Sequence, residues 1–106
     1  YSRFAKIGGE MISLGAVEQS VLKAVQQDIE IVAIATKDPQ KGESIVLLHQ
    51  GELDKKQINQ AMLDAGCNPL MLPKTYFMVE EVPKLGAGKT DFNQAKKLAL
   101  SLQGVS

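Results

Sequence analysis

Cysteine, excess charge and long hydrophobic runs are all scarce in this 106-residue chain. Its one cysteine, Cys67, has no partner for a disulfide within the chain, which fits a reducing compartment. The longest wholly apolar run, from Ile31 to Ala35, is too short to span a bilayer. Lysine and arginine together number 12, as do aspartate and glutamate, so the formal net charge is zero. Broad nucleic-acid binding is therefore disfavoured, because it depends on a basic surface that neutralises phosphates.

What is present indicates one globular domain. Hydrophobic residues make up 44% of the chain, a share typical of folded proteins, and 106 residues suffice for a single modest core. No internal repeat, low-complexity tract or linker divides the sequence. The chain begins at Tyr1 rather than at a methionine, so we expect it to be a segment of a longer protein.

Hydrophobic periodicity and turn residues predict an α+β fold. Residues 3–14 form two short extended segments around Gly8 and Gly9, and a glycine pair can adopt the positive φ angles of a tight hairpin turn. The further predicted elements are a helix over 15–27, strands over 29–36 and 44–49, a helix from Asp54 to Gly66, a strand over 75–79 and a helix from Asp91 to Gly104. We therefore expect a small sheet of about three strands with flanking helices plus an N-terminal β-hairpin, in one domain over 1–106.

Two of these helices carry recognisable start signals. Asp54 and Asp91 are each followed three residues later by a glutamine, at capping-box spacing. The last helix is expected to bury one apolar face, formed by Phe92, Ala95, Leu98, Ala99 and Leu102.

The stretch PKLGAGKT, residues 83–90, looks like the end of a phosphate-binding P-loop. A P-loop needs G-x-x-x-x-G-K-[ST], because its first glycine lets backbone N–H groups curl around phosphates. Counting back from Gly88, the place of that glycine is taken by Pro83, which has no N–H and a fixed φ. Only 16 residues follow Thr90, too few for the later strand that supplies a magnesium-binding aspartate. The P-loop interpretation is therefore rejected.

Lys89 keeps two interpretations on spacing alone. Gly86 and Gly88 give the loop freedom, so the lysine could be an ordinary solvated residue in a flexible loop. Alternatively, the flexible loop could deliver one positive charge to a phosphate group. Residue spacing does not decide between them.

Two motifs together resemble those of one enzyme superfamily. KIGGEMISLGAVE near the start and VPKLGAGKTDF near the end are similar to signature motifs in the C-terminal domain of adenylate-forming enzymes. That superfamily includes acyl-CoA synthetases, luciferases and nonribosomal-peptide adenylation domains, and the resemblance covers the whole chain in the right order. The longer wording SRFAKIGGEMISLGAVEQ, with LGAGKTDF later, is closer still to the acyl-[acyl-carrier-protein] synthetase part of bifunctional 2-acylglycerophosphoethanolamine acyltransferases.

The resemblance implies a two-step ligase reaction. ATP with Mg²⁺ and a fatty acid give an acyl-adenylate and pyrophosphate, and the pantetheine thiol of an acyl carrier protein or of CoA then takes the acyl group. By this resemblance Lys89 is the catalytic lysine of the first step. It is carried on the flexible loop that contains Gly86 and Gly88.

The resemblance implies two further roles at the start of the chain. The loop that lines the pantetheine tunnel would consist of Gly8, Gly9 and Glu10, where missing side chains let a ligand lie against the backbone. The hinge on which such a lid domain turns falls at Ser2, followed by Arg3. The family usually has aspartate or lysine at the hinge, so this departure leaves the position of the hinge open.

The implied parent enzyme is larger than this chain. The acyl and ATP pockets would lie mainly in an N-terminal adenylation domain, so we expect this C-terminal lid to be inactive alone. It would be a cytoplasmic domain, and by the closer resemblance its parent would be associated with the bacterial inner membrane. The alternatives are the lid of an acyl-CoA synthetase and a non-catalytic module that binds a carrier protein or another partner.

Metal binding and nucleophilic catalysis find little support in the sequence. His49 stands alone at a strand end, without a second histidine or cysteine at ligand spacing, so we predict no metal site. Cys67 precedes Asn-Pro and has no base nearby in the sequence. The basic residues Arg3, Lys6 and Lys23 could instead steer an acidic carrier protein toward the hairpin.

Overall fold

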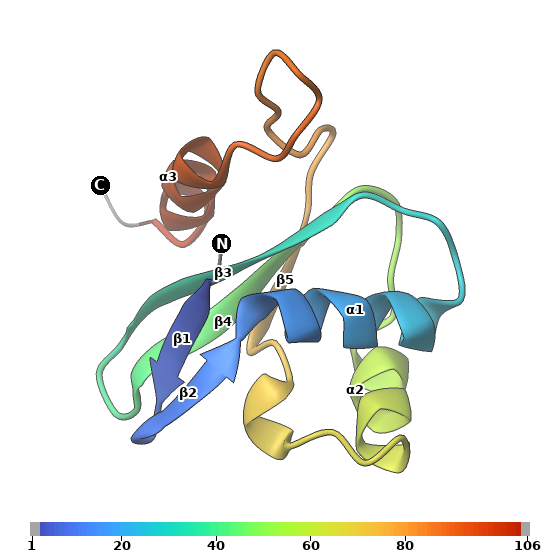
Figure 1. Ribbon diagram of the computed structural model, residues 1–106, viewed down its shortest axis with the longest axis vertical. Coiled ribbons are helices and arrows are strands. Elements are labelled where there is room, and N and C mark those ends of the chain that lie inside the picture. Colours follow the sequence, from blue (N-terminus) through green and yellow to red (C-terminus); the bar gives the residue numbers. More distant parts are fainter. Residues whose placement is uncertain (1–2, 105–106) are drawn as a thin grey trace.

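The computed structural model describes residues 3–104, and the predicted α+β class is confirmed. Ser2, the expected hinge residue, lies outside the described residues. The elements, shown in Figure 1, are β1 (Phe4–Ile7), β2 (Glu10–Ser13), α1 (Leu14–Val25), β3 (Ile31–Asp38), β4 (Gly42–His49), α2 (Lys55–Asp64), a 3-10 turn (Pro69–Met71), β5 (Thr75–Met78) and α3 (Phe92–Leu102). β3 and β4 extend further into their connecting turn than predicted, because Asp38 pairs with Gly42 across a tight hairpin.

β4 is the centre of a five-stranded mixed sheet. It pairs antiparallel with β3 over eight residue pairs and parallel with β5, beginning at Val46↔Thr75. These three strands are the small sheet that the sequence predicts. The predicted N-terminal hairpin of β1 and β2 is also present, and it joins the sheet through a single pair, Ile7↔Gly42.

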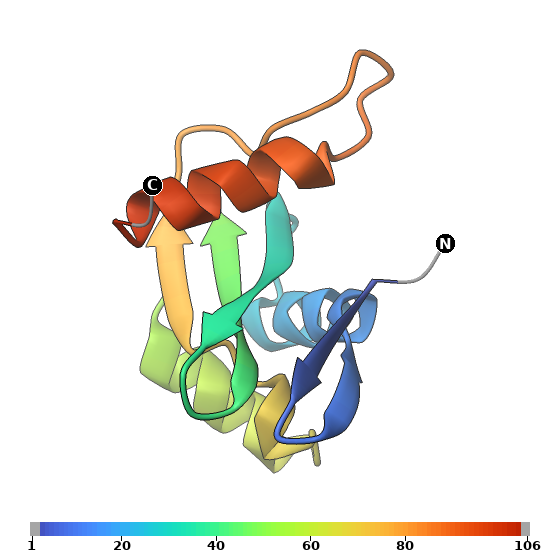
Figure 2. The ribbon, with the colours of Figure 1, turned by 90° about the vertical axis from the view of Figure 1, so that its left-hand side faces the viewer.

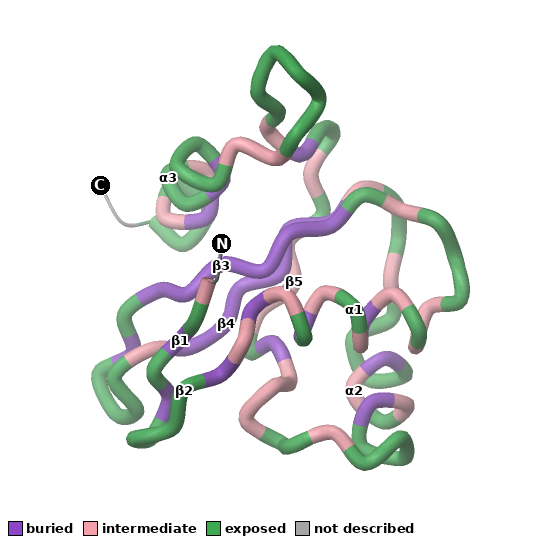
Figure 3. The backbone as a smooth tube through the Cα atoms, viewed as in Figure 1, coloured by how far each residue is buried: buried purple, intermediate pink, exposed green. Residues whose placement is uncertain are grey.

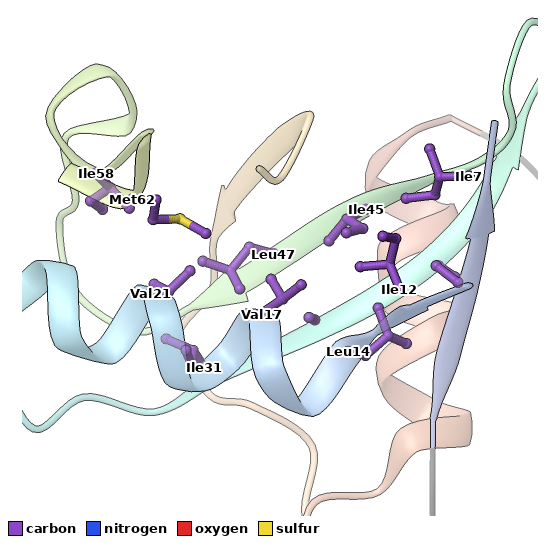
Figure 4. Close-up of a cluster of buried hydrophobic side chains, with 13 residues drawn as sticks. Ile7, Ile12, Leu14, Val17, Val21, Ile31, Ile45, Leu47, Ile58 and Met62 are labelled. Carbon is purple, nitrogen blue, oxygen red and sulfur yellow. The ribbon is translucent and has the colours of Figure 1, made fainter. Parts of the chain in front are cut away.

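Both faces of the central strands are covered, and Figure 3 shows them as buried. Alternate residues of β3 and β4 point to opposite faces of the sheet. On one face, Ala33 and Leu47 join α1 and α2 in the larger core (Figure 4). On the other face, Val32 and Leu48 pack with α3 in a smaller core. Burial on both faces explains why β3 begins with a continuous apolar run rather than an alternating pattern.

α3 contacts the sheet through small residues and not through its whole predicted apolar face. Ala95 and Ala99 are fully buried, and Leu98 is half-buried against the same core. The prediction that Phe92 and Leu102 are buried is wrong, since they are 36% and 43% exposed. They occupy the first and last positions of α3, whereas its buried contact is confined to the central turns.

Side-chain caps start all three α-helices. The carboxylates of Asp54 and Asp91 accept hydrogen bonds from backbone N–H groups three residues later, as predicted. α1 is capped by the hydroxyl of Ser13, which accepts from the N–H of Ala16 at 3.1 Å and was not predicted. In the part of the chain that the structure describes, no helix is both long and apolar enough to cross a membrane.

Candidate functional site

The loop that carries Lys89 projects from the body of the domain, as Figure 2 shows, and is a small hairpin of its own. Lys84 and Thr90 pair antiparallel at its base, and the N–H of Leu85 donates to the carbonyl of Lys89 at 2.7 Å. The N–H of Gly88 donates to the carbonyl of Leu85 at 2.9 Å and closes a tight turn at the tip. The loop therefore holds its shape through hydrogen bonds of its own.

The two glycines of this loop have different structural parts. Gly88 has a φ of +87°, a conformation that glycine adopts far more readily than other residues, whereas Gly86 is not in the positive-φ region. A Cβ atom added at Gly86 would meet nothing within 4 Å. The observed conformation therefore demands glycine at position 88 but not at position 86.

The side chain of Lys89 is exposed at this loop. Between residues 3 and 104, it takes part in no ion pair and no side-chain hydrogen bond. Lys84, at the base of the loop, is instead tied to Glu30, with Nζ 2.9 Å from Oε2. The ammonium group of Lys89 is thus accessible to an anion from outside the domain, which is compatible with both interpretations of the sequence.

Gly8 and Gly9 form the tight turn between β1 and β2, with φ angles of +57° and +87°. The predicted positive φ at both positions is confirmed. The N–H of Gly8 donates to the carbonyl of Lys41 at 2.9 Å, which ties the turn to the β3–β4 connection. A Cβ atom at either glycine would meet nothing within 4 Å, so the backbone lies open to an approaching ligand. Glu10 begins β2 beside the turn, and its carboxylate accepts from the amide of Asn68 at 3.4 Å.

The glycine turn and the Lys89 loop lie at opposite ends of the domain, and both views show this separation (Figures 1 and 2). The domain measures 36 × 32 × 28 Å along its principal axes. The structure therefore does not bring Lys89 together with Gly8 and Gly9.

A pocket of about 420 Å³ opens near the glycine turn, and its charged lining residues are Asp38, Lys41, Lys55 and Lys74. The carboxylate of Asp38 lies 2.9 Å from Nζ of Lys74 and accepts from the N–H groups of Gln40 and Lys41. These hydrogen bonds, that from Lys74 above all, lower the pKa of Asp38 from 3.8 to about 2. The pocket therefore carries more positive than negative charge, a feature that the sequence analysis did not predict.

Arg3, which follows the expected hinge residue Ser2, lies in a polar network with Glu18 of α1. Their side chains are only 16% and 17% exposed, and Nη2 lies 2.6 Å from Oε1. Sequence reasoning missed Glu18. The sequence did contain a signal for it, because Glu18 is a charged residue next to Val17 and four residues after Leu14, and α1 buries both of these apolar residues.

His49, the last residue of β4, is buried. It is 4% exposed, its Nδ1 lies 2.8 Å from the carbonyl oxygen of Gly51, and its ring packs edge-on against Tyr76. Burial raises the pKa of Tyr76, whose hydroxyl donates to Asn59 at 2.9 Å. Within the described residues, no three or more His, Cys, Asp or Glu side chains gather as metal ligands would.

No family model matches the sequence. Solved structures do match, and an acyl-CoA synthetase of Brucella canis superposes with a TM-score of 0.80 at 19% identity, over 95% of this chain and 20% of that one. This chain has the fold of one fifth of an acyl-CoA synthetase. A fatty acyl CoA synthetase of Mycobacterium tuberculosis gives a TM-score of 0.81 at 17% identity, over 93% of this chain and 20% of that one. ATP-bound MatB of Rhodopseudomonas palustris gives a TM-score of 0.78 at 15% identity, over 93% of this chain and 20% of that one. The matched fifth is the C-terminal part of these ligases, and the likeness concerns the fold.

Proposed function

We propose that this chain is the mobile C-terminal domain of an adenylate-forming ligase. The observation that carries the proposal is the position of two motif turns at opposite ends of a domain with this fold. In such an enzyme ATP and a carboxylic acid give an acyl-adenylate and pyrophosphate, and a thiol then takes the acyl group. A domain that rotates between the two steps would present one turn to each.

Lys89 would be the catalytic lysine of adenylation. Negative charge grows on the α-phosphate oxygens in that step, and an ammonium group stabilises it once water is excluded. Lys89 is suited to this role because it is exposed, has no ion-pair partner among residues 3–104 and stands on a projecting loop. ATP and Mg²⁺ would be held mainly by an N-terminal adenylation domain, into which the loop would reach.

Gly8, Gly9 and Glu10 would line the path of the acceptor's pantetheine arm in the second step. The open space around both glycines lets an extended chain lie against the backbone. The positive charge of the nearby pocket, which includes Lys41, would suit the phosphate at the far end of that arm. Both CoA and an acyl carrier protein present a pantetheine thiol, so either fits this surface.

The finer proposal is an acyl-[acyl-carrier-protein] synthetase that acts on a fatty acid, as part of a 2-acylglycerophosphoethanolamine acyltransferase. It rests on the close resemblance of residues 2–19 and 85–92 to that group of enzymes. The parent would then work at the bacterial inner membrane, with this domain in the cytoplasm. The chain alone would be inactive, because its substrates would bind mainly to the larger domain.

The test separates the two half-reactions in the ligase that contains this chain. Lys89→Ala should lower ATP–pyrophosphate exchange by about 10²-fold or more, because one group that stabilises transition-state charge is lost. Acyl transfer from a supplied acyl-adenylate should be largely kept. Gly9→Leu should show the reverse pattern, with exchange kept and transfer lost.

Lys96→Ala is the matched control, since Lys96 is also exposed but lies on α3, away from the loop. It should leave both half-reactions unchanged. If Lys89→Ala leaves exchange intact, the loop is not catalytic, and the chain is better described as a non-catalytic interaction module.

A further inference from the structure

The guanidinium group of Arg3 is held by three elements that are far apart in the sequence. Its Nη2 lies 2.6 Å from Oε1 of Glu18 in α1, and its Nη1 donates to the carbonyl of Ala33 in β3 at 3.0 Å. The guanidinium carbon Cζ lies over the ring of Phe92, the first residue of α3, at 4.0 Å from the ring centroid. One side chain thus connects the segment that enters β1 to helices of both layers.

Glu18 makes this arrangement a closed network. Its Oε2 accepts from the N–H of Ala33 at 2.8 Å, while its Oε1 binds Arg3. Both backbone groups of Ala33 are therefore satisfied by this ion pair, at a strand that ends the sheet order. Because both charged side chains are mostly buried, the loss of either would leave the other without its partner.

Phe92 links the network to the loop that carries Lys89. It directly follows Asp91, whose N–H donates to the carbonyl of Pro83 at 2.9 Å and so closes the base of the loop. A guanidinium group stacks on an aromatic face through its plane, which the compact ammonium of a lysine cannot reproduce. The contact between Arg3 and Phe92 therefore constrains the place where the loop meets α3.

We propose that Arg3 is a positioning residue, which holds the base of the Lys89 loop through Phe92 so that the entering segment and the loop move together. The loop is then already in place when the domain turns. This consequence for catalysis rests on the function proposed above for Lys89. The mechanical link itself can be tested on the chain alone.

The first test measures amide hydrogen exchange by NMR on the ¹⁵N-labelled chain. Arg3→Lys keeps the positive charge but loses the guanidinium that lies over the ring and binds Glu18 and Ala33 through two separate nitrogens. Phe92→Leu keeps an apolar side chain and loses only the ring. Each should speed exchange at Asp91 and Gly88 by about fivefold, the factor for a stacking energy of ~1 kcal/mol. The double variant should be no faster than the faster of the two single variants, because both substitutions remove the contact between Arg3 and Phe92. Exchange at Leu47, deep in the core, should be unchanged in all three.

Phe4→Leu is the matched control. Phe4 is an exposed aromatic residue next to Arg3 in the sequence, but the ring that contacts the guanidinium group is that of Phe92. It should leave the hydrogen-exchange rates of the Asp91 and Gly88 amides unchanged. The proposal is overturned if Arg3→Lys folds and the amides of Asp91 and Gly88 exchange as before, or if the two effects simply add. Should Arg3→Lys fail to fold, the exchange rates of Phe92→Leu alone decide the question, because Phe92 is 36% exposed and its replacement should leave the chain folded.

The second test uses the ligase that contains this chain. Arg3→Lys should lower the kcat of ATP–pyrophosphate exchange by about fivefold and leave acyl transfer from a supplied acyl-adenylate unchanged, a split that general destabilisation would not produce. If Lys89→Ala has no effect on ATP–pyrophosphate exchange, the proposed function fails. The amide hydrogen-exchange measurement still tests whether Arg3 holds the loop. If Lys89→Ala abolishes ATP–pyrophosphate exchange and Arg3→Lys does not slow it, the positioning role of Arg3 is wrong and the proposed function stands.

Discussion

Asp38 and Lys74 lie 36 residues apart in the sequence and form an ion pair, with 2.9 Å between Oδ2 and Nζ. The aspartate side chain is 4% exposed, whereas that of the lysine is 66% exposed. Asp38 also accepts from two backbone N–H groups in the β3–β4 turn, so the pair joins this turn to the segment before β5. The buried carboxylate is therefore held in its ionised form by one exposed lysine and by the two N–H groups.

Replacing Lys74 with methionine is expected to raise the pKa of Asp38 toward its ordinary value. Because the folded-state pKa of about 2 lies below 3.8, ionised Asp38 stabilises the fold above about pH 4, and this contribution is lost as the pH falls through about 2. Lys74→Met should thus lower the free energy of unfolding at pH 6 and have little effect near pH 2. Urea unfolding at both pH values measures this. Lys96→Met, at an exposed site, should show no such dependence, and equal losses for Lys74→Met at both pH values would contradict the prediction.

Alanine at position 88 should cost stability where alanine at position 86 does not. Gly88→Ala places a Cβ atom on a residue with φ +87°, which costs about 1–2 kcal/mol. Gly86→Ala meets open space at an ordinary φ and should be neutral or slightly stabilising, because it restricts the unfolded chain. Urea unfolding of the two variants provides the comparison. Equal effects would mean that the loop has a different backbone conformation.

Leu47→Ala should be strongly destabilising. Leu47 is fully buried in the core between the sheet and the two helices α1 and α2, so its truncation leaves a cavity and should cost about 2–5 kcal/mol. Leu63→Ala in α2 is the control, since Leu63 is 41% exposed and its truncation should cost less than about 1 kcal/mol. Thermal or urea unfolding tests the difference, and comparable losses for the two variants would argue against this core.

Tyr76 should remain un-ionised for as long as the chain is folded. Burial raises its pKa above the ordinary value of 10, so this residue stabilises the fold below about pH 10 and ceases to do so as the pH rises further. An alkaline titration that follows phenolate absorbance should therefore show a step that coincides with unfolding, as monitored by circular dichroism. Tyr76→Phe should remove this step and leave the signal of Tyr1, the other tyrosine. Ionisation of Tyr76 in the folded chain would show that its hydroxyl is open to water.

Local features of the structure could be predicted from the sequence because they depend on neighbouring residues. The Gly8–Gly9 turn follows from the φ angles that glycine allows, and the caps at Asp54 and Asp91 follow from side chains that reach N–H groups three residues away. The face of α3 was predicted less well. Its periodicity includes Phe92, but whether that ring is buried depends on what stands opposite, and that is Arg3.

The sequence by itself determined the α+β class, the order of the elements and the two exposed turns that hold the candidate site. Periodicity, glycines and caps act over a few residues, so they can be recognised along the chain. Only the tertiary structure decided that Arg3 meets Glu18 and Phe92, and that the Lys89 loop stands far from the glycine turn. Such contacts join charged and aromatic side chains that are far apart in the sequence. Many residues of the same types could be partners, and no local pattern specifies which of them the packing of the chain brings together.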